Sequence, residues 1–298
     1  MAHQDAQKKS KEKRGFSPLG GHLVDVLLVA VFLFGLAILL YPTISNIRTS
    51  QVMRRSVSQY DAKVQTMTSA DFDAEWQKVD AYNALVAQVG LSSYFPDDMH
   101  QQYEEAINLS GDQQAMMGHI EIPKLSVDLP IYHGTSDDVL TAGVGHIEGS
   151  SLPGGGPSTH TVLSGHRGLP TSELFTNLDQ MQEGDVFFLH VMNRNLAYEV
   201  DQIRIVLPNE LEDLQVQPGE DLCTLVTCTP YAINTHRLLV RGHRIEYPEE
   251  ANVAADAIKV DPLLVASILA VPAFVAAIIA LVVRRAQKKA SFKGAQST

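Results

Sequence analysis

Cysteine is scarce in this chain of 298 residues, which holds only Cys223 and Cys228. Five residues of extended strand would keep their α-carbons roughly 16 Å apart, far beyond the reach of a disulfide bond. The sequence therefore excludes a fold stapled by disulfides and predicts two free thiols.

Basic residues are scarce everywhere except at the two ends of the chain. The terminal tails hold ten of the 23 lysines and arginines but only two of the 34 acidic residues, which leaves 13 basic against 32 acidic residues between them. This excess of acidic residues between the tails argues against binding to nucleic acid or to anionic lipid. It fits cationic or lysine-bearing partners.

Charged residues are nearly absent from two long apolar runs, Leu23–Tyr41 and Pro262–Val283. Each run is close to the ~20 residues that span hydrocarbon, so we expect two transmembrane helices; a cleaved signal peptide is the alternative for the first. Lysines and arginines flank the outer end of each run, which places both termini in the cytoplasm and the middle outside. An extracellular protein without disulfides is typical of a bacterial surface.

Composition then divides the chain into segments. They are a cytoplasmic tail (1–22), a transmembrane helix (23–42), an extracellular helical region (43–117), a strand-rich domain (118–248), a linker (249–261), a second transmembrane helix (262–283) and a second cytoplasmic tail (284–298).

The helical region begins with an amphipathic pattern. Ser69 and Asp71 offer capping groups, and apolar residues recur at three-to-four spacing from Phe72 until Gly90 ends the pattern. The polar stretch that follows, 91–118, is interpreted as a mobile connector with a short helix near 101–108.

From His119 onward the pattern changes to short segments rich in β-branched and apolar residues, separated by turn residues. The predicted strands are Ile120–Ile122, Thr161–Leu163, Val186–Val191, Ala197–Val206, Leu222–Cys228 and Arg237–Ile245. Many short strands with few helices between them favour a mostly β, closed barrel over a parallel α/β sheet.

The two thiols differ in their position along one predicted strand. Cys228 ends the strand and is followed by Thr229-Pro230, a place where a turn exposes nucleophiles, although a small buried hydrophobe is the alternative. The odd separation puts Cys223 on the opposite face, and we interpret that residue as structural.

A thiol with an ordinary pKa of ~8.5 is only a few per cent ionised at neutral pH, so a nucleophile needs a nearby base or cation. His166 stands in a glycine-flanked turn, and Arg237 begins the strand after Cys228. Arg241 and Arg244 compete with Arg237, and spacing alone does not rank them. His160 and His166 lack the spacing of a metal site.

The segments Thr224–Tyr231 and Asn234–Gly242 closely resemble the active-site signature of class C sortases, which assemble pili. Further segments resemble the same family in the same order, over about residues 118–247. They are Ile122–Lys124, Leu129–Thr135, Gly143–His146 and Leu163–Pro170.

The resemblance implies the eight-stranded sortase β-barrel, here with a helical N-terminal extension and two flanking transmembrane helices. It implies Cys228, His166 and Arg237 as the catalytic residues, which decides among the arginines, and requires no metal or organic cofactor. Cys228 would attack the Thr-Gly bond of a Leu-Pro-x-Thr-Gly-like (LPXTG-like) sorting signal, Arg237 would hold the oxyanion, and His166 would protonate the leaving amine.

By the same resemblance, the thioester would pass to a lysine amine of another pilin subunit on the surface of a Gram-positive cell. One alternative is a sortase that attaches proteins to peptidoglycan, and another is a membrane-tethered binding module without enzymatic activity. The connector departs from the Asp-Pro-aromatic lid motif of class C, because it reads Tyr94-Phe95-Pro96-Asp97. We still expect part of 91–108 to cover the groove at Cys228.

Overall fold

The computed structural model describes residues 18–91, 96–109, 115–169 and 171–248, together with scattered positions between 270 and 287. The chain divides into two compact units, Met1–Tyr41 and Pro42–Thr298. The boundary falls within the first helix, α1 (Pro18–Val64), which is much longer than the predicted anchor 23–42.

The first part of α1 carries the predicted membrane anchor. Among the described residues, the stretch Val29–Val64 of α1 is the one helix long and apolar enough to cross a membrane. Its large apolar side chains, such as Phe34 and Ile38, are mostly exposed, as they would be when facing lipid. The second predicted span, 262–283, lies largely outside the described residues and stays a prediction.

The last turns of α1 belong to the second unit and pack on its core. Met53, Val57 and Tyr60 are buried at helical spacing. The Tyr60 hydroxyl donates to the Met117 carbonyl oxygen at 2.7 Å and accepts from the Met192 amide at 2.8 Å. These bonds join the end of α1 to two separate parts of the barrel.

Helix α2 (Ser69–Val89) follows as predicted, and Gly90 ends it. Its N-cap is Thr68 rather than Ser69 or Asp71, because the Thr68 and Asp71 side chains each accept the other's backbone amide in a capping box. The buried face presents Trp76, the single tryptophan of the chain.

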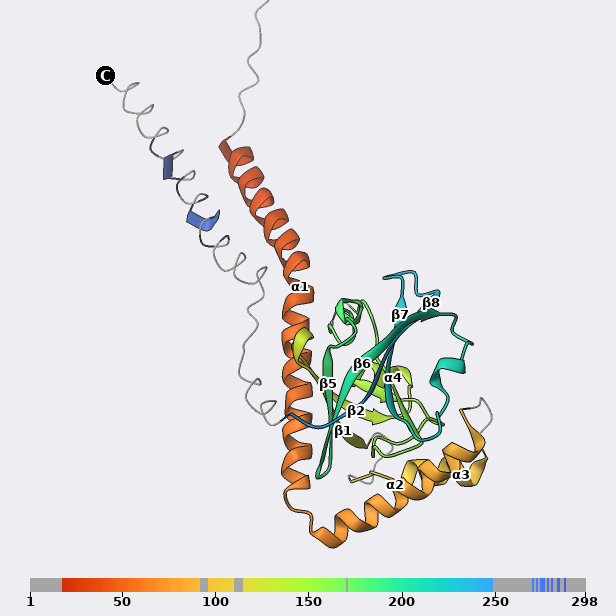
Figure 1. Ribbon diagram of the computed structural model, residues 1–298. Coiled ribbons are helices and arrows are strands. Elements are labelled where there is room, and N and C mark those ends of the chain that lie inside the picture. Colours follow the sequence, from red (N-terminus) through yellow and green to blue (C-terminus); the bar gives the residue numbers. More distant parts are fainter. Residues whose placement is uncertain are drawn as a thin grey trace, which may run out of the picture. The chain divides into compact units, whose positions relative to one another are not determined.

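The described residues hold eight strands. They are β1 (Met116–Ile122), β2 (Val127–His133), β3 (Val144–His146), β4 (Thr159–Ser164), β5 (Val186–Val191), β6 (Arg194–Val206), β7 (Asp221–Thr229) and β8 (His236–Ile245). They close in the order β1-β2-β3-β4-β7-β8-β6-β5, which confirms the closed barrel. Figure 1 shows the strands gathered in one body, with α2 and α3 along its lower side. The pairs β2/β3 and β4/β7 are parallel and the others antiparallel.

Short helices lie between these strands and before the first of them. They are α3 (Asp97–Glu105), α4 (Asp137–Ala142) and the 3₁₀ turns η1 (Pro123–Leu125), η2 (Leu178–Gln180) and η3 (Glu212–Leu214). Strands β2 and β3 were not among the strands predicted from composition. The segment η3 lies between β6 and β7 and closes over the outer face of the sheet.

Side chains alternate strictly along β7. Cys223, Leu225 and Thr227 point to the barrel interior and are buried, whereas Val226 and Cys228 point outward. The interior side chains join one core with β1, β2, β5 and α2. A smaller outer cluster covers the opposite face of the sheet and consists of Val162, Val206, Leu214, Val226 and Leu239.

The connector is better ordered than its composition predicts. Helix α3 begins at Asp97, earlier than the expected helix at 101–108. Tyr103 is buried, and its hydroxyl donates to the His146 carbonyl oxygen at 3.1 Å and accepts from the Gly134 amide at 2.8 Å. Because polar contacts to β2 and β3 hold it, this helix is docked on the barrel rather than mobile.

Candidate active site

Cys228 lies one residue before the end of β7 and is partly exposed. Its direct partner across the antiparallel ladder is Arg237, the second residue of β8. Directly opposed residues project to the same face of a sheet, so the thiol and the guanidinium share the outer face. The sequence predicted that Arg237 lies beside Cys228, because one turn joins their two strands, and the ladder confirms it.

Cys223 has the structural character that the sequence indicated. It is fully buried in the barrel core, and burial together with the nearby Asp221 carboxylate raises the pKa of its thiol well above the ordinary value. The thiol therefore stays protonated at neutral pH and makes a poor nucleophile. Both cysteines are free.

His166 follows the end of β4, which runs parallel to β7. Ser164 pairs with Val226, and the Gly165 amide donates to the Val226 carbonyl oxygen at 3.0 Å. The Thr227 hydroxyl in turn donates to the Gly165 carbonyl oxygen at 2.7 Å. His166 lies two residues after Ser164, and Cys228 lies two residues after Val226. Because the two strands are parallel, both side chains lie at the same end of the sheet.

The three candidate arginines of β8 have different partners. Arg241 forms two 3.0 Å hydrogen bonds with the Asp201 carboxylate, and Arg244 lies over the Tyr198 ring. Arg237 donates only to backbone carbonyl oxygens of its own turn, and it has no carboxylate partner among the described residues. Of the three cations, Arg237 is the one beside Cys228 and available to an anion.

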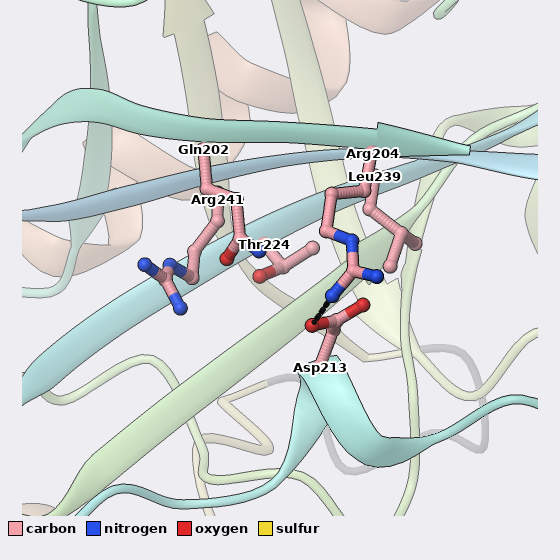
Figure 2. Close-up of a pocket in the computed structure, with 6 residues that line it drawn as sticks. All are labelled: Gln202, Arg204, Asp213, Thr224, Leu239 and Arg241. Atoms are coloured by element: carbon pink, nitrogen blue, oxygen red, sulfur yellow. Dashed lines mark hydrogen bonds and ion pairs between the residues drawn. The ribbon is translucent and has the colours of Figure 1, made fainter. Parts of the chain in front are cut away.

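A shallow polar depression lies on the same outer face, farther along β7 and β8 from Cys228. Figure 2 shows its lining, which consists of Gln202, Arg204, Asp213, Thr224, Leu239 and Arg241. An ion pair of 2.7 Å between Arg204 and Asp213 ties β6 to η3 across this depression. The segment containing η3 is thereby held as a wall beside the outer face.

The connector reaches this outer face through Leu91. Its side chain packs on the outer cluster, and its amide and carbonyl both bond to the Gln215 side chain at 3.0 Å. The start of the expected lid therefore lies over the sheet that carries Cys228. Tyr94 and Phe95 of the altered lid motif lie outside the described residues, so coverage of the thiol stays a prediction.

His160 fills a structural place beneath that wall. Its Nε2 lies 2.7 Å from the Thr224 hydroxyl and its Nδ1 lies 2.9 Å from the Gln215 carbonyl oxygen. Burial lowers the pKa of His160, which keeps the ring neutral at physiological pH. Both nitrogens are thus occupied, and the described part of the chain offers no group of three residues able to hold a metal ion.

Sequence reasoning assigned no role to Arg167, which the structure places beside the site. Its guanidinium donates to the Thr229 hydroxyl at 3.2 Å and pairs with the Asp179 carboxylate. In the sequence, Arg167 is marked only by its position directly after His166. An exposed loop arginine could occupy that position equally well, so the sequence gives no reason to assign it a role.

Comparison with known proteins identifies the barrel. The sortase domain family matches residues 120–245. The structure of Streptococcus pneumoniae sortase C is 46% identical, with a TM-score of 0.57, and the match covers 65% of this chain and 97% of that one. Clostridium perfringens sortase C, solved with the C-terminal cell wall sorting motif, is 41% identical at a TM-score of 0.57, covering 65% and 99%.

A curated relative, sortase A of Bacillus anthracis, is 28% identical over 138 residues, which are 46% of this chain and 64% of that protein. The similarity to the two solved structures extends over nearly their whole length at more than 40% identity. These two solved structures are class C sortases, and the chain belongs to the sortase family of cysteine transpeptidases.

Proposed function

We propose that this chain is a membrane-anchored class C sortase that joins pilin subunits, with Cys228 as nucleophile, His166 as general acid and base, and Arg237 as oxyanion partner. The observation that carries the proposal is the meeting of β4, β7 and β8 at one end of the outer face. There the ladder pairs Cys228 with Arg237 and the parallel strand brings His166.

The first step is acylation of the enzyme. The Cys228 thiolate attacks the carbonyl carbon between threonine and glycine of the sorting signal, and the Arg237 guanidinium stabilises the negative oxygen that forms. The carbon–nitrogen bond then breaks, and His166 gives its proton to the leaving glycine amine. A thioester on Cys228 and a free glycine amine are the products.

The second step transfers the acyl group. A lysine amine of the next pilin subunit attacks the thioester carbonyl, and His166 accepts the amine proton as the carbon–sulfur bond breaks. The thiolate is regenerated and an isopeptide bond remains. Arg237 suits both steps because it has no carboxylate partner among the described residues that would compete with an oxyanion.

The substrate class is supported by the relatives. Clostridium perfringens sortase C was solved with the C-terminal cell wall sorting motif, and the Streptococcus pneumoniae sortase C structure provides insights into pilin substrate specificity. We extend both to this chain as an LPXTG-like signal and a pilin lysine. The acidic composition of the chain between its tails favours a cationic acceptor.

The membrane topology is part of the proposal. The helix α1 supplies one anchor, and the second apolar run, 262–283, would supply another. With lysines and arginines clustered at both tails, both termini lie in the cytoplasm and the barrel lies outside the cell membrane.

The test is mass spectrometry of the detergent-solubilised chain after incubation with a Leu-Pro-x-Thr-Gly peptide and an amine acceptor. Wild type should form a thioester and a transpeptidation product, and Cys228→Ala should form neither. Arg237→Ala should lower turnover far more than Arg241→Ala, whose partner is Asp201. Product from the Cys228→Ala chain would refute the assigned nucleophile. With pilin as substrate, a ladder of polymers supports pilus assembly, and a single anchored species supports attachment to peptidoglycan.

A further inference from the structure

Arg167 is an almost fully buried cation at the active end of the barrel. Its side chain is only 9% exposed, and it spans two partners, the Thr229 hydroxyl and the Asp179 carboxylate. Thr229 is itself buried, whereas the Asp179 side chain is half exposed. One guanidinium thus joins the turn after β4, the end of β7 and η2.

The positions of these partners in the sequence matter more than their number. Arg167 directly follows His166, and Thr229 directly follows Cys228. On the preceding side, Gly165 is already bonded to β7 through the Val226 carbonyl and the Thr227 hydroxyl. The two candidate catalytic residues are therefore bracketed by contacts between their own neighbours.

The segment leading into η2 holds the other side of the loop that carries His166. The Phe175 amide donates to the His166 carbonyl oxygen at 3.2 Å, and the Gly168 amide donates to the Thr176 hydroxyl at 3.0 Å. Asp179 holds Arg167 from the same segment. The loop is consequently clamped between β7 on one side and the segment leading into η2 on the other.

Stability alone is a poor reason for this arrangement. The Nε atom of Arg167 is buried and has no hydrogen-bond partner among the described residues, which is a cost for a donor taken out of water. A buried cation paired to a half-exposed carboxylate gains little over an apolar side chain of similar size. What an apolar residue could not supply is the directed contact to Thr229.

We propose that Arg167 is a positioning residue that fixes the separation of His166 and Cys228 by tying the residue after one to the residue after the other. This rests on the proposed function, because it assumes that His166 and Cys228 act together. Arg167 touches neither of the reacting groups. Loosening it should therefore slow the chemical step and leave peptide binding unchanged.

The test compares Arg167→Ala, Asp179→Asn and Arg167→Lys in the full chain in detergent, using a fluorogenic Leu-Pro-x-Thr-Gly peptide. Because small misplacements of reacting groups are costly, kcat should fall roughly ten- to hundredfold in the first two variants, with KM unchanged within about twofold. Lysine reaches only one of the two partners, so Arg167→Lys should restore kcat only in part. The matched control is Arg194→Ala, which removes a guanidinium that bridges Gly154 and Trp76 elsewhere.

A second measurement separates positioning from simple charge and needs no substrate. The rate of Cys228 alkylation by iodoacetamide is followed against pH in each variant. Arg167→Ala removes a positive charge and Asp179→Asn removes a negative one, so a pure charge effect would move the midpoints in opposite directions. Loss of positioning should move both midpoints to higher pH, because in both variants the Cys228 thiol loses the neighbouring base that a working nucleophile needs.

The outcomes are distinct. A midpoint in Asp179→Asn that stays in place or moves to lower pH overturns the proposal, as does a fall of kcat in Arg194→Ala equal to that in Arg167→Ala. If the wild-type chain fails to cleave the peptide, the proposed function is in question. The alkylation profiles still decide whether Arg167 fixes the two residues.

Discussion

Lowering the pH from neutral to 4.5 should destabilise the folded chain through His146. This residue of β3 is fully buried, with Nε2 2.9 Å from the Ser151 carbonyl oxygen and Nδ1 3.2 Å from the Tyr103 hydroxyl. Burial lowers the pKa of His146 from 6.5 to about 3. Between those values the unfolded chain binds a proton that the folded chain excludes.

The magnitude follows from proton linkage. Above pH 6.5 both states are neutral at this site and stability does not depend on it. As the pH falls below 6.5, each pH unit removes about 1.4 kcal/mol of unfolding free energy, until the folded-state pKa is reached. The loss should be on the order of 1.4 kcal/mol at pH 5.5 and 2.7 kcal/mol at pH 4.5. The lowered pKa of His160 adds a loss of the same sign.

The assay is urea unfolding at pH 7.5, 5.5 and 4.5, followed by the fluorescence of Trp76, which sits where α2 docks on the barrel. The matched variant is His146→Gln, whose amide can meet the same two partners but does not titrate. Between pH 7.5 and 4.5 the wild type should lose about 2.7 kcal/mol more than the variant. Parallel pH dependences of the two proteins would refute the assignment of His146 as a buried neutral base.

Three further predictions concern packing around the barrel. Tyr103→Phe leaves the partly buried Gly134 amide without its acceptor and should cost about 1 kcal/mol, with faster exchange of that amide measured by NMR. Asn83→Ala removes both hydrogen bonds to the Leu152 backbone that hold α2 on the barrel. It should lower the Tm, measured by the fluorescence of Trp76 on the same helix. Iodoacetamide should label one thiol in the native chain and a second, Cys223, only after unfolding.

The barrel could be predicted because most of its strands are short segments rich in β-branched and apolar residues that turn residues separate. Sequence patterns do not reveal β2 and β3, for physical reasons. β2 contains Pro130, which lies just before β3 begins to pair at Ile131, so the missing amide costs that ladder nothing. β3 spans only three residues, of which Gly145 is one, and close packing against the Gly134 carbonyl leaves no room for a side chain there. A strand interrupted by proline and a strand of three residues therefore do not stand out in the sequence as β-rich segments.

The candidate site shows the same division. The proximity of Cys228 and Arg237 follows from the turn that joins their strands, and the pattern predicts it. Spacing could not choose between Arg237 and Arg241, because both side chains project from the same face of β8. The choice depends on Asp201, a residue 40 positions before Arg241 that takes its guanidinium. Such a pairing is a property of the closed barrel and not of the local sequence.

On the outer face, the connector, the wall that contains η3 and the strand that bears Cys228 pack together. Gln215 holds the Leu91 backbone with its side chain and offers its own carbonyl to His160, which in turn meets Thr224 of β7. Leu91 packs on the outer cluster from above. A connector that moved away from the outer face would therefore expose the apolar surface under Leu91 and break its two hydrogen bonds to Gln215, so its position is coupled to the shape of the wall beside that face.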